Sequence, residues 1–129
     1  MIIISTEKPV LNRLETQPDS IEYDDRNLAA VGIECLICSD GLVGFLLIRY
    51  CSLDPVTVEG DHWYFGFEEL LSDIQEGYGV SLNKWKYRGS NEVLSAHCLL
   101  KQIINEYECD PKYAGKVKVL NWDSEYESV

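Results

Sequence analysis

Two apolar, β-rich segments separated by a tight-turn signal constrain the fold of this chain more than any other feature. Residues 31–38 and 42–50 are nearly apolar throughout, and Asp40-Gly41 between them supplies the positive φ angles that a hairpin turn requires. Strands that are apolar on both sides usually lie in the interior of a sheet. The pattern therefore predicts a central antiparallel hairpin around which the remaining elements must pack.

Further strands are predicted after this hairpin. Residues 56–59 and 62–65 flank Gly60-Asp61, a second two-residue turn signal, and so predict a second hairpin. Residues 80–88 are a candidate for a short extended segment, and residues 116–120 alternate in polarity as a strand does.

Two segments show helical spacing instead. Apolar residues recur at helical intervals from Phe67 to Tyr78, and again from Val93 to Tyr107, where Ser90 or Asn91 is a candidate cap. Asp110-Pro111 is expected to end the second helix. We therefore expect an α+β fold, with a mainly antiparallel sheet of five or six strands and two helices packed against it.

The length of 129 residues and the hydrophobic fraction of 46% predict one packed domain. Within it, residues 1–30 are expected to form a loop-rich N-terminal arm and residues 122–129 an acidic C-terminal tail. No apolar stretch reaches membrane-spanning length, and the apolar start at Met1–Ile4 is too short for a signal sequence. The five cysteines form an odd set, and four of them lie inside apolar patterns, so we expect a cytosolic protein without a disulfide framework.

The charge balance restricts the class of partner. The chain has 22 acidic and 11 basic residues, a formal net charge of −11. Such a field repels nucleic-acid phosphates and anionic membranes, and it attracts a basic protein. We therefore expect a monomer that binds a basic protein in a 1:1 complex, and no binding to nucleic acid or membrane.

The cysteines and histidines do not form a recognisable catalytic or metal-binding motif. Cys35 and Cys38 have the spacing of a zinc or redox pair, but on a strand they point to opposite faces. His97 and Cys98 are helical neighbours and therefore point about 100° apart. His62 follows a turn signal with no partner indicated by the sequence. We expect no cofactor, no metal and no catalytic residue.

One basic and aromatic island, residues 84–88, could in principle clamp a single nucleic-acid strand. Because the overall charge opposes nucleic acid, we favour a strand with Trp85 and Tyr87 directed inward and the cations directed to solvent.

Segments that mix carboxylates with large aromatic rings are the candidates for partner binding, because rings provide contact area and carboxylates provide steering. The residues concerned are Glu22, Tyr23, Asp24, Asp25, Glu59, Asp61, Trp63, Trp122, Asp123, Glu125, Tyr126 and Glu127.

In its small size, its acidity, its hairpin-plus-helix layout and its lack of catalytic motifs, the chain resembles the immunity proteins of bacterial polymorphic toxin systems, including contact-dependent growth inhibition. The resemblance is to the class and involves no diagnostic motif, so no residue roles are transferred. It implies that the protein binds a cognate toxin domain, often a nuclease with a basic cleft, and occludes it without chemistry of its own.

Two alternatives remain open. One is a nucleic-acid mimic of phage type that blocks a DNA- or RNA-binding enzyme. The other is a small enzyme or ligand-binding domain in which His62, Trp63 and Trp85 line a cleft between sheet and helix.

Overall fold

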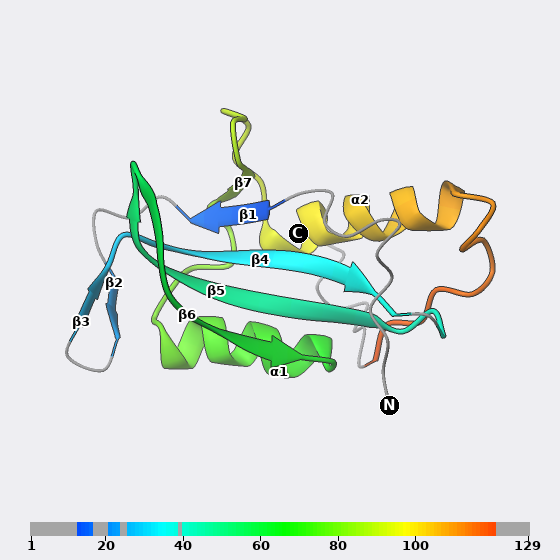
Figure 1. The fold of residues 1–129 in the computed structure, drawn as a ribbon, viewed down its shortest axis with the longest axis horizontal. Coiled ribbons are helices and arrows are strands. Elements are labelled where there is room, and N and C mark those ends of the chain that lie inside the picture. The colour runs from blue at the N-terminus through cyan, green and yellow to red at the C-terminus, as the bar shows by residue number, and fades with distance from the viewer. Residues whose placement is uncertain (1–12, 17–20, 24–25, 39, 121–129) are drawn as a thin grey trace.

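The computed structural model describes residues 13–16, 21–23, 26–38 and 40–120, with side chains from residue 28 onward. Three long strands form an antiparallel meander, and two short strands extend it in the order β6-β5-β4-β1-β7 (Figure 1). The strands of this sheet are β1 (Arg13–Thr16), β4 (Ala30–Ile37), β5 (Val43–Leu53), β6 (Val56–Tyr64) and β7 (Trp85–Tyr87). The helices are α1 (Phe67–Ser72), which continues into a π-helical segment η1 (Asp73–Gly77), and α2 (Ala96–Cys109). The predicted α+β class, with an antiparallel sheet and two helices, is confirmed.

The central hairpin forms where the sequence predicts it. The amide of Cys38 donates to the carbonyl of Leu42 at 2.8 Å, and the amide of Gly41 donates to the carbonyl of Cys38 at 2.9 Å. Gly41 has φ of +91°, a left-handed conformation that glycine adopts without steric cost. All eight residues of β4 are buried, as expected for an interior strand.

The second hairpin turns at Asp54-Pro55, so the prediction of a turn at Gly60-Asp61 is wrong. Strand β6 runs without a break through this dipeptide, and Gly60 lies opposite Arg49 of β5. A Cβ atom at residue 60 would overlap the guanidinium group of Arg49. The glycine is therefore needed for the close approach of a neighbouring side chain instead of a turn.

The core lies on the face of the sheet that the helices cover. The pairs Ile33↔Leu47 and Cys35↔Phe45 are in register on this face. Against them pack buried side chains of both helices: Phe67, Leu70 and Leu71 of α1, and Leu99, Leu100 and Ile103 of α2. A smaller buried cluster of Ala30, Ile48 and Tyr50 lies on the opposite face. Strand β6 is followed directly by α1, and the two elements are in contact (Figure 1).

Helix α2 begins later than the spacing predicts. Its N-cap is Ser95, whose hydroxyl accepts a hydrogen bond from the amide of Cys98 at 3.1 Å. Leu94 exchanges two backbone hydrogen bonds of 2.8 Å with Trp85, so this segment belongs to the sheet and cannot be helical. Val93 is consequently 56% exposed, in contrast to its predicted place on the buried stripe. The other stripe residues, His97, Leu100, Ile104 and Tyr107, are buried as predicted.

The two ends of the described chain also differ from expectation. Residues 116–120 make only isolated bridges, Leu42↔Lys118 and Gly66↔Leu120, in place of the predicted strand. The described part of the expected loop-rich arm contains three short strands: β1, which joins the main sheet, and the pair β2 (Ile21–Tyr23) and β3 (Arg26–Leu28). The predicted acidic tail, residues 122–129, lies outside the described residues. Neither helix of the described chain has the length and apolar character needed to cross a membrane.

Candidate functional site

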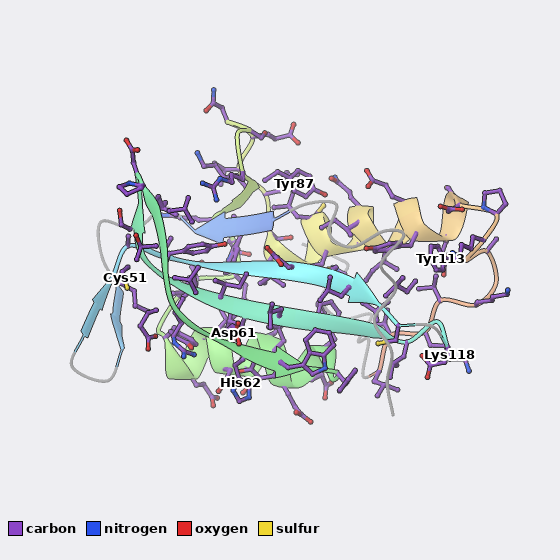
Figure 2. The ribbon with its side chains drawn as sticks, in the orientation of Figure 1. Cys51, Asp61, His62, Tyr87, Tyr113 and Lys118 are labelled. Atoms are coloured by element: carbon purple, nitrogen blue, oxygen red, sulfur yellow. The ribbon has the colours of Figure 1, made fainter. Side chains whose placement is uncertain are left out.

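Negative charge is concentrated in one continuous stretch of the chain. Between Arg49 and Lys84 the sequence contains seven carboxylates and no lysine or arginine. The carboxylates are Asp54, Glu59, Asp61, Glu68, Glu69, Asp73 and Glu76. This stretch folds into β6, α1 and η1. Asp61 and His62, labelled in Figure 2, are neighbours on β6 and point to opposite faces of the sheet.

The opposite edge of the sheet carries the opposite charge. Strand β7 is the last strand at that edge, and Lys84, Lys86 and Arg88 lie in and beside it. Trp85 is fully buried, and the hydroxyl of Tyr87 donates to the carbonyl of Leu99 at 2.9 Å. The predicted inward orientation of both rings is thus confirmed, and neither ring is placed for stacking with a nucleobase.

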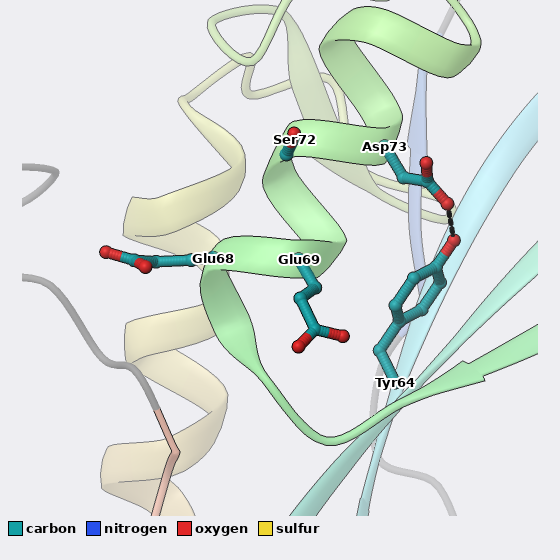
Figure 3. Close-up of a pocket in the computed structure, with 5 residues that line it drawn as sticks. All are labelled: Tyr64, Glu68, Glu69, Ser72 and Asp73. Carbon is teal, nitrogen blue, oxygen red and sulfur yellow. Dashed lines mark hydrogen bonds between the residues drawn. The ribbon is translucent and has the colours of Figure 1, made fainter.

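A pocket opens in the acidic region between the end of β6 and α1. It has a volume of about 450 Å³ and is lined by Tyr64, Glu68, Glu69, Ser72 and Asp73. The phenol of Tyr64 donates a hydrogen bond to the carboxylate of Asp73, which fixes the ring against the helix (Figure 3). The side chain of Glu69 extends from α1 on the side of Tyr64, whereas Glu68 points away from them. We call these five residues the acidic pocket.

Three exposed carboxylates of this region have no cationic partner within the described chain. Glu68, Glu69 and Asp61 form no ion pair with any described residue. No group of three or more His, Cys, Asp or Glu side chains in the described part of the chain is placed to hold a metal ion. Separated carboxylates suit an organic cation, such as a guanidinium or ammonium group, which can donate hydrogen bonds in several directions.

Of the predicted partner-binding residues, Glu59 has a different role from the one expected. Its carboxylate accepts a hydrogen bond from Arg49 Nε, and both side chains are only 14% exposed. Burial alone would lower the pKa of Arg49, but the hydrogen bonds to Glu59 and Tyr78 outweigh it and raise the pKa above its ordinary value. The negative charge of Glu59 is therefore compensated inside the protein and contributes little to the outward field.

Asp61 and Trp63 do lie at the surface of β6. Asp61 is exposed, while Trp63 is half-buried and contacts Phe65 edge to face at 5.3 Å between ring centroids. The Trp63 ring also covers Gly44, where a Cβ atom would overlap it. Because side chains alternate along a strand, Trp63 lies on the face opposite His62 and Tyr64.

The alternation of side chains along β6 argues against the alternative of an enzyme or ligand-binding domain whose cleft is lined by His62, Trp63 and Trp85. His62 and Trp63 point to opposite faces of the sheet, and Trp85 is enclosed in the core. The three residues proposed to line one cleft therefore do not share one.

The remaining predicted residues have no described side chains. The backbone of Glu22 and Tyr23 forms part of β2, but their side chains lie outside the described residues. The other predicted residues, Asp24, Asp25, Trp122, Asp123, Glu125, Tyr126 and Glu127, also lie outside them. Their part in binding stays a prediction.

The acidic pocket was missed by reasoning from the sequence. From the sequence, Glu68 and Glu69 are adequately explained as acidic residues at the positive end of the α1 dipole. No further role was therefore expected for them, although both side chains are exposed. The signal that could have located the site is the absence of lysine and arginine between Arg49 and Lys84.

The cysteine and histidine geometry agrees with a structural role. Cys35 and Cys38 are both buried, and burial raises the pKa of the Cys35 thiol well above its usual range. His97 packs against Phe67 with 5.4 Å between ring centroids, whereas Cys98 is exposed. The two cannot face each other as a nucleophile and its base.

No family model matches this chain, and neither a curated protein nor a solved structure is significantly similar to it.

Proposed function

We propose that this protein binds a basic partner protein through β6 and α1 and occludes it, as an immunity protein does with its toxin domain. A nuclease domain is the partner class that fits best, because its substrate-binding cleft is basic. The observation that supports the proposal is a group of exposed carboxylates beside the pocket, of which Glu68 and Glu69 form no ion pair with any described residue. We call this surface the acidic face; it comprises Glu68, Glu69 and Asp73 at the pocket, and Glu76 in the η1 segment that follows.

The uneven distribution of charge favours one orientation of the complex. The acidic face and the basic β7 edge lie at opposite ends of the strand order, so the molecule has a charge gradient across its sheet. A basic partner is attracted to one end and repelled by the other, which orients the encounter before contact. Net charge alone would attract the partner without choosing a face.

Occlusion requires a complementary surface and no bond-breaking chemistry. In the pocket the carboxylate of Asp73 is held by its hydrogen bond to Tyr64, and Glu69 extends from α1 on the same side. Cationic side chains of the partner can form ion pairs with these carboxylates. Charge-assisted hydrogen bonds to arginine are among the stronger polar contacts in interfaces. The same geometry would compete directly with phosphate groups for a basic nuclease cleft.

The test is capture of the partner with matched variants. The pocket variant Glu68→Gln/Glu69→Gln/Asp73→Asn removes three negative charges from the acidic face. The control variant Glu92→Gln/Glu106→Gln/Glu108→Gln removes three charges from exposed sites elsewhere. The immobilised parent and control variant should retain the same basic protein from extracts of the native host, and the pocket variant should lose it. Equal retention by all three proteins would contradict the proposal.

A further inference from the structure

The backbone of β6 offers a second kind of recognition beside charge. β6 is the outermost strand of the sheet, and β5 is its only sheet partner within the described part of the chain. In an edge strand, alternate residues direct their N–H and C=O groups away from the sheet. Val56 and Val58 in its first half are 42% and 49% exposed. Within the described part of the chain, no strand other than β5 pairs with β6, so its outer edge is unoccupied there.

The other edge of the sheet is closed. The amide and carbonyl of Trp85 in β7 are both bonded to Leu94 at 2.8 Å, so a segment of the same chain covers this edge. Among the described strands of the main sheet, β6 is thus the one that can accept a partner strand.

Charge decides what kind of strand fits. Pairing of β6 with β6 of a second copy would place the exposed Asp61 of both molecules along one strand pair, and β6 contains no lysine or arginine to offset this charge. Like charges directly opposite one another destabilise a strand pair, and charged edge residues commonly prevent self-association for this reason. A strand rich in arginine or lysine would instead be attracted.

We propose that β6 pairs with a basic β-strand of the partner, and that an arginine or lysine of this strand enters the acidic pocket. This inference rests on the proposed function and adds the mode of binding. Main-chain hydrogen bonds along an added strand give affinity, and pockets for alternate side chains give specificity.

The pocket lies where a side chain of an added strand can reach it. Tyr64 and His62 lie on the helix-covered face of β6, with 4.6 Å between their ring centroids. Alternate side chains of a strand paired to β6 would point to this same face, beside Tyr64. There Glu69 and Asp73 can accept hydrogen bonds from the cation.

The experiment uses two synthetic peptides of nine residues, the length of β6. In the first, arginine alternates with valine and threonine; the second has the same sequence with N-methyl groups on alternate residues. The two peptides have the same charge, but the second cannot complete a strand ladder. Fluorescence anisotropy at low ionic strength should show binding of the first peptide, and N-methylation should weaken it by about tenfold or more. Hydrogen exchange at the outward amides of β6 should slow only with the first peptide.

Two variants test the pocket separately. Glu69→Gln/Asp73→Asn should weaken binding of the first peptide about tenfold, because both acceptors of the cation lose their charge. Glu106→Gln/Glu108→Gln removes the same charge from exposed positions of α2 and should change the affinity much less.

The outcomes separate this inference from the proposed function. Equal binding of the two peptides would overturn strand pairing and leave charge-driven binding intact. Failure of both peptides to bind would also overturn the inference, because the first one has the charge and the backbone that β6 should accept. Partner capture with the charge variants decides the proposed function independently, since it uses neither peptide.

Discussion

Removing the ion pair between Arg49 and Glu59 should destabilise the fold, because the two groups are mostly withdrawn from water. Both side chains are 14% exposed, which places the pair between the fully buried and the fully exposed case. Breaking a buried pair by deleting one partner costs about 3 to 5 kcal/mol, and an exposed pair contributes about 0 to 1 kcal/mol. For Arg49→Met we therefore expect a loss of about 2 kcal/mol in the free energy of unfolding.

A double-mutant cycle distinguishes the pair from its individual residues. Glu59→Gln keeps an oxygen that can accept from Arg49 and should cost about 1 kcal/mol. Arg49→Met/Glu59→Gln should be no less stable than Arg49→Met alone, because no uncompensated carboxylate remains, which gives a coupling energy of about 1 kcal/mol or more. Urea denaturation is the assay; with a slope near about 2 kcal/mol per molar urea, the midpoint for Arg49→Met should fall by about 1 M.

Asp61→Asn is the matched control, since Asp61 lies on the same strand but is exposed and has no ion-pair partner among the described residues. Its effect should stay within about 0.5 kcal/mol. If Arg49→Met and Glu59→Gln were equally mild and showed no coupling, Glu59 would be a solvated carboxylate. The assignment of Glu59 to the fold instead of the acidic face would then be wrong.

Two other predictions concern the α2 region. Ser95→Ala removes the side-chain acceptor of the Cys98 amide at the start of α2 and should cost about 1 kcal/mol in urea denaturation; an unchanged midpoint would show that water replaces the cap. Burial raises the pKa of Tyr87 to about 12, above the value near about 10 of an unfolded tyrosine. The stability that this group contributes is therefore complete below pH ~10 and is lost as the pH rises toward about 12. Tyr87→Phe should flatten this alkaline decline in thermal melts, and an identical decline in both proteins would contradict the assignment.

The predictable parts of the fold are those set by local pattern. The hairpin around Asp40-Gly41 needs only two apolar runs and a residue pair that tolerates positive φ. The buried stripe from His97 to Tyr107 needs only helical spacing. In both cases neighbouring residues along the chain contain the whole signal.

The parts that could not be predicted depend on contacts between distant residues. Gly60-Asp61 has the composition of a turn, but the requirement that prevails is space for Arg49 on the adjacent strand. Ser90 and Asn91 are good caps by type, but the bridge between Trp85 and Leu94 keeps the chain extended past them.

The candidate site also has one property that the sequence predicts and others that depend on contacts between distant residues. The net charge predicts the sign of the partner, because charge is additive along a sequence. It does not reveal that Glu59 is compensated by Arg49, ten residues away, or that Asp73 binds Tyr64. Which carboxylates face outward together depends on strand pairing, so the acidic pocket becomes visible only in three dimensions.

The rate of association with the captured partner, measured by stopped flow across a range of salt concentrations, tests the central claim most directly. Charges on the acidic face act over a screening length of about 8 Å at physiological ionic strength, so added salt should slow association steeply. The parent and the control variant Glu92→Gln/Glu106→Gln/Glu108→Gln should show this dependence. The pocket variant Glu68→Gln/Glu69→Gln/Asp73→Asn should associate more slowly at low salt and respond less to its addition. A pocket variant with the same rates and the same salt dependence as the parent would contradict the assignment of partner binding to the acidic face.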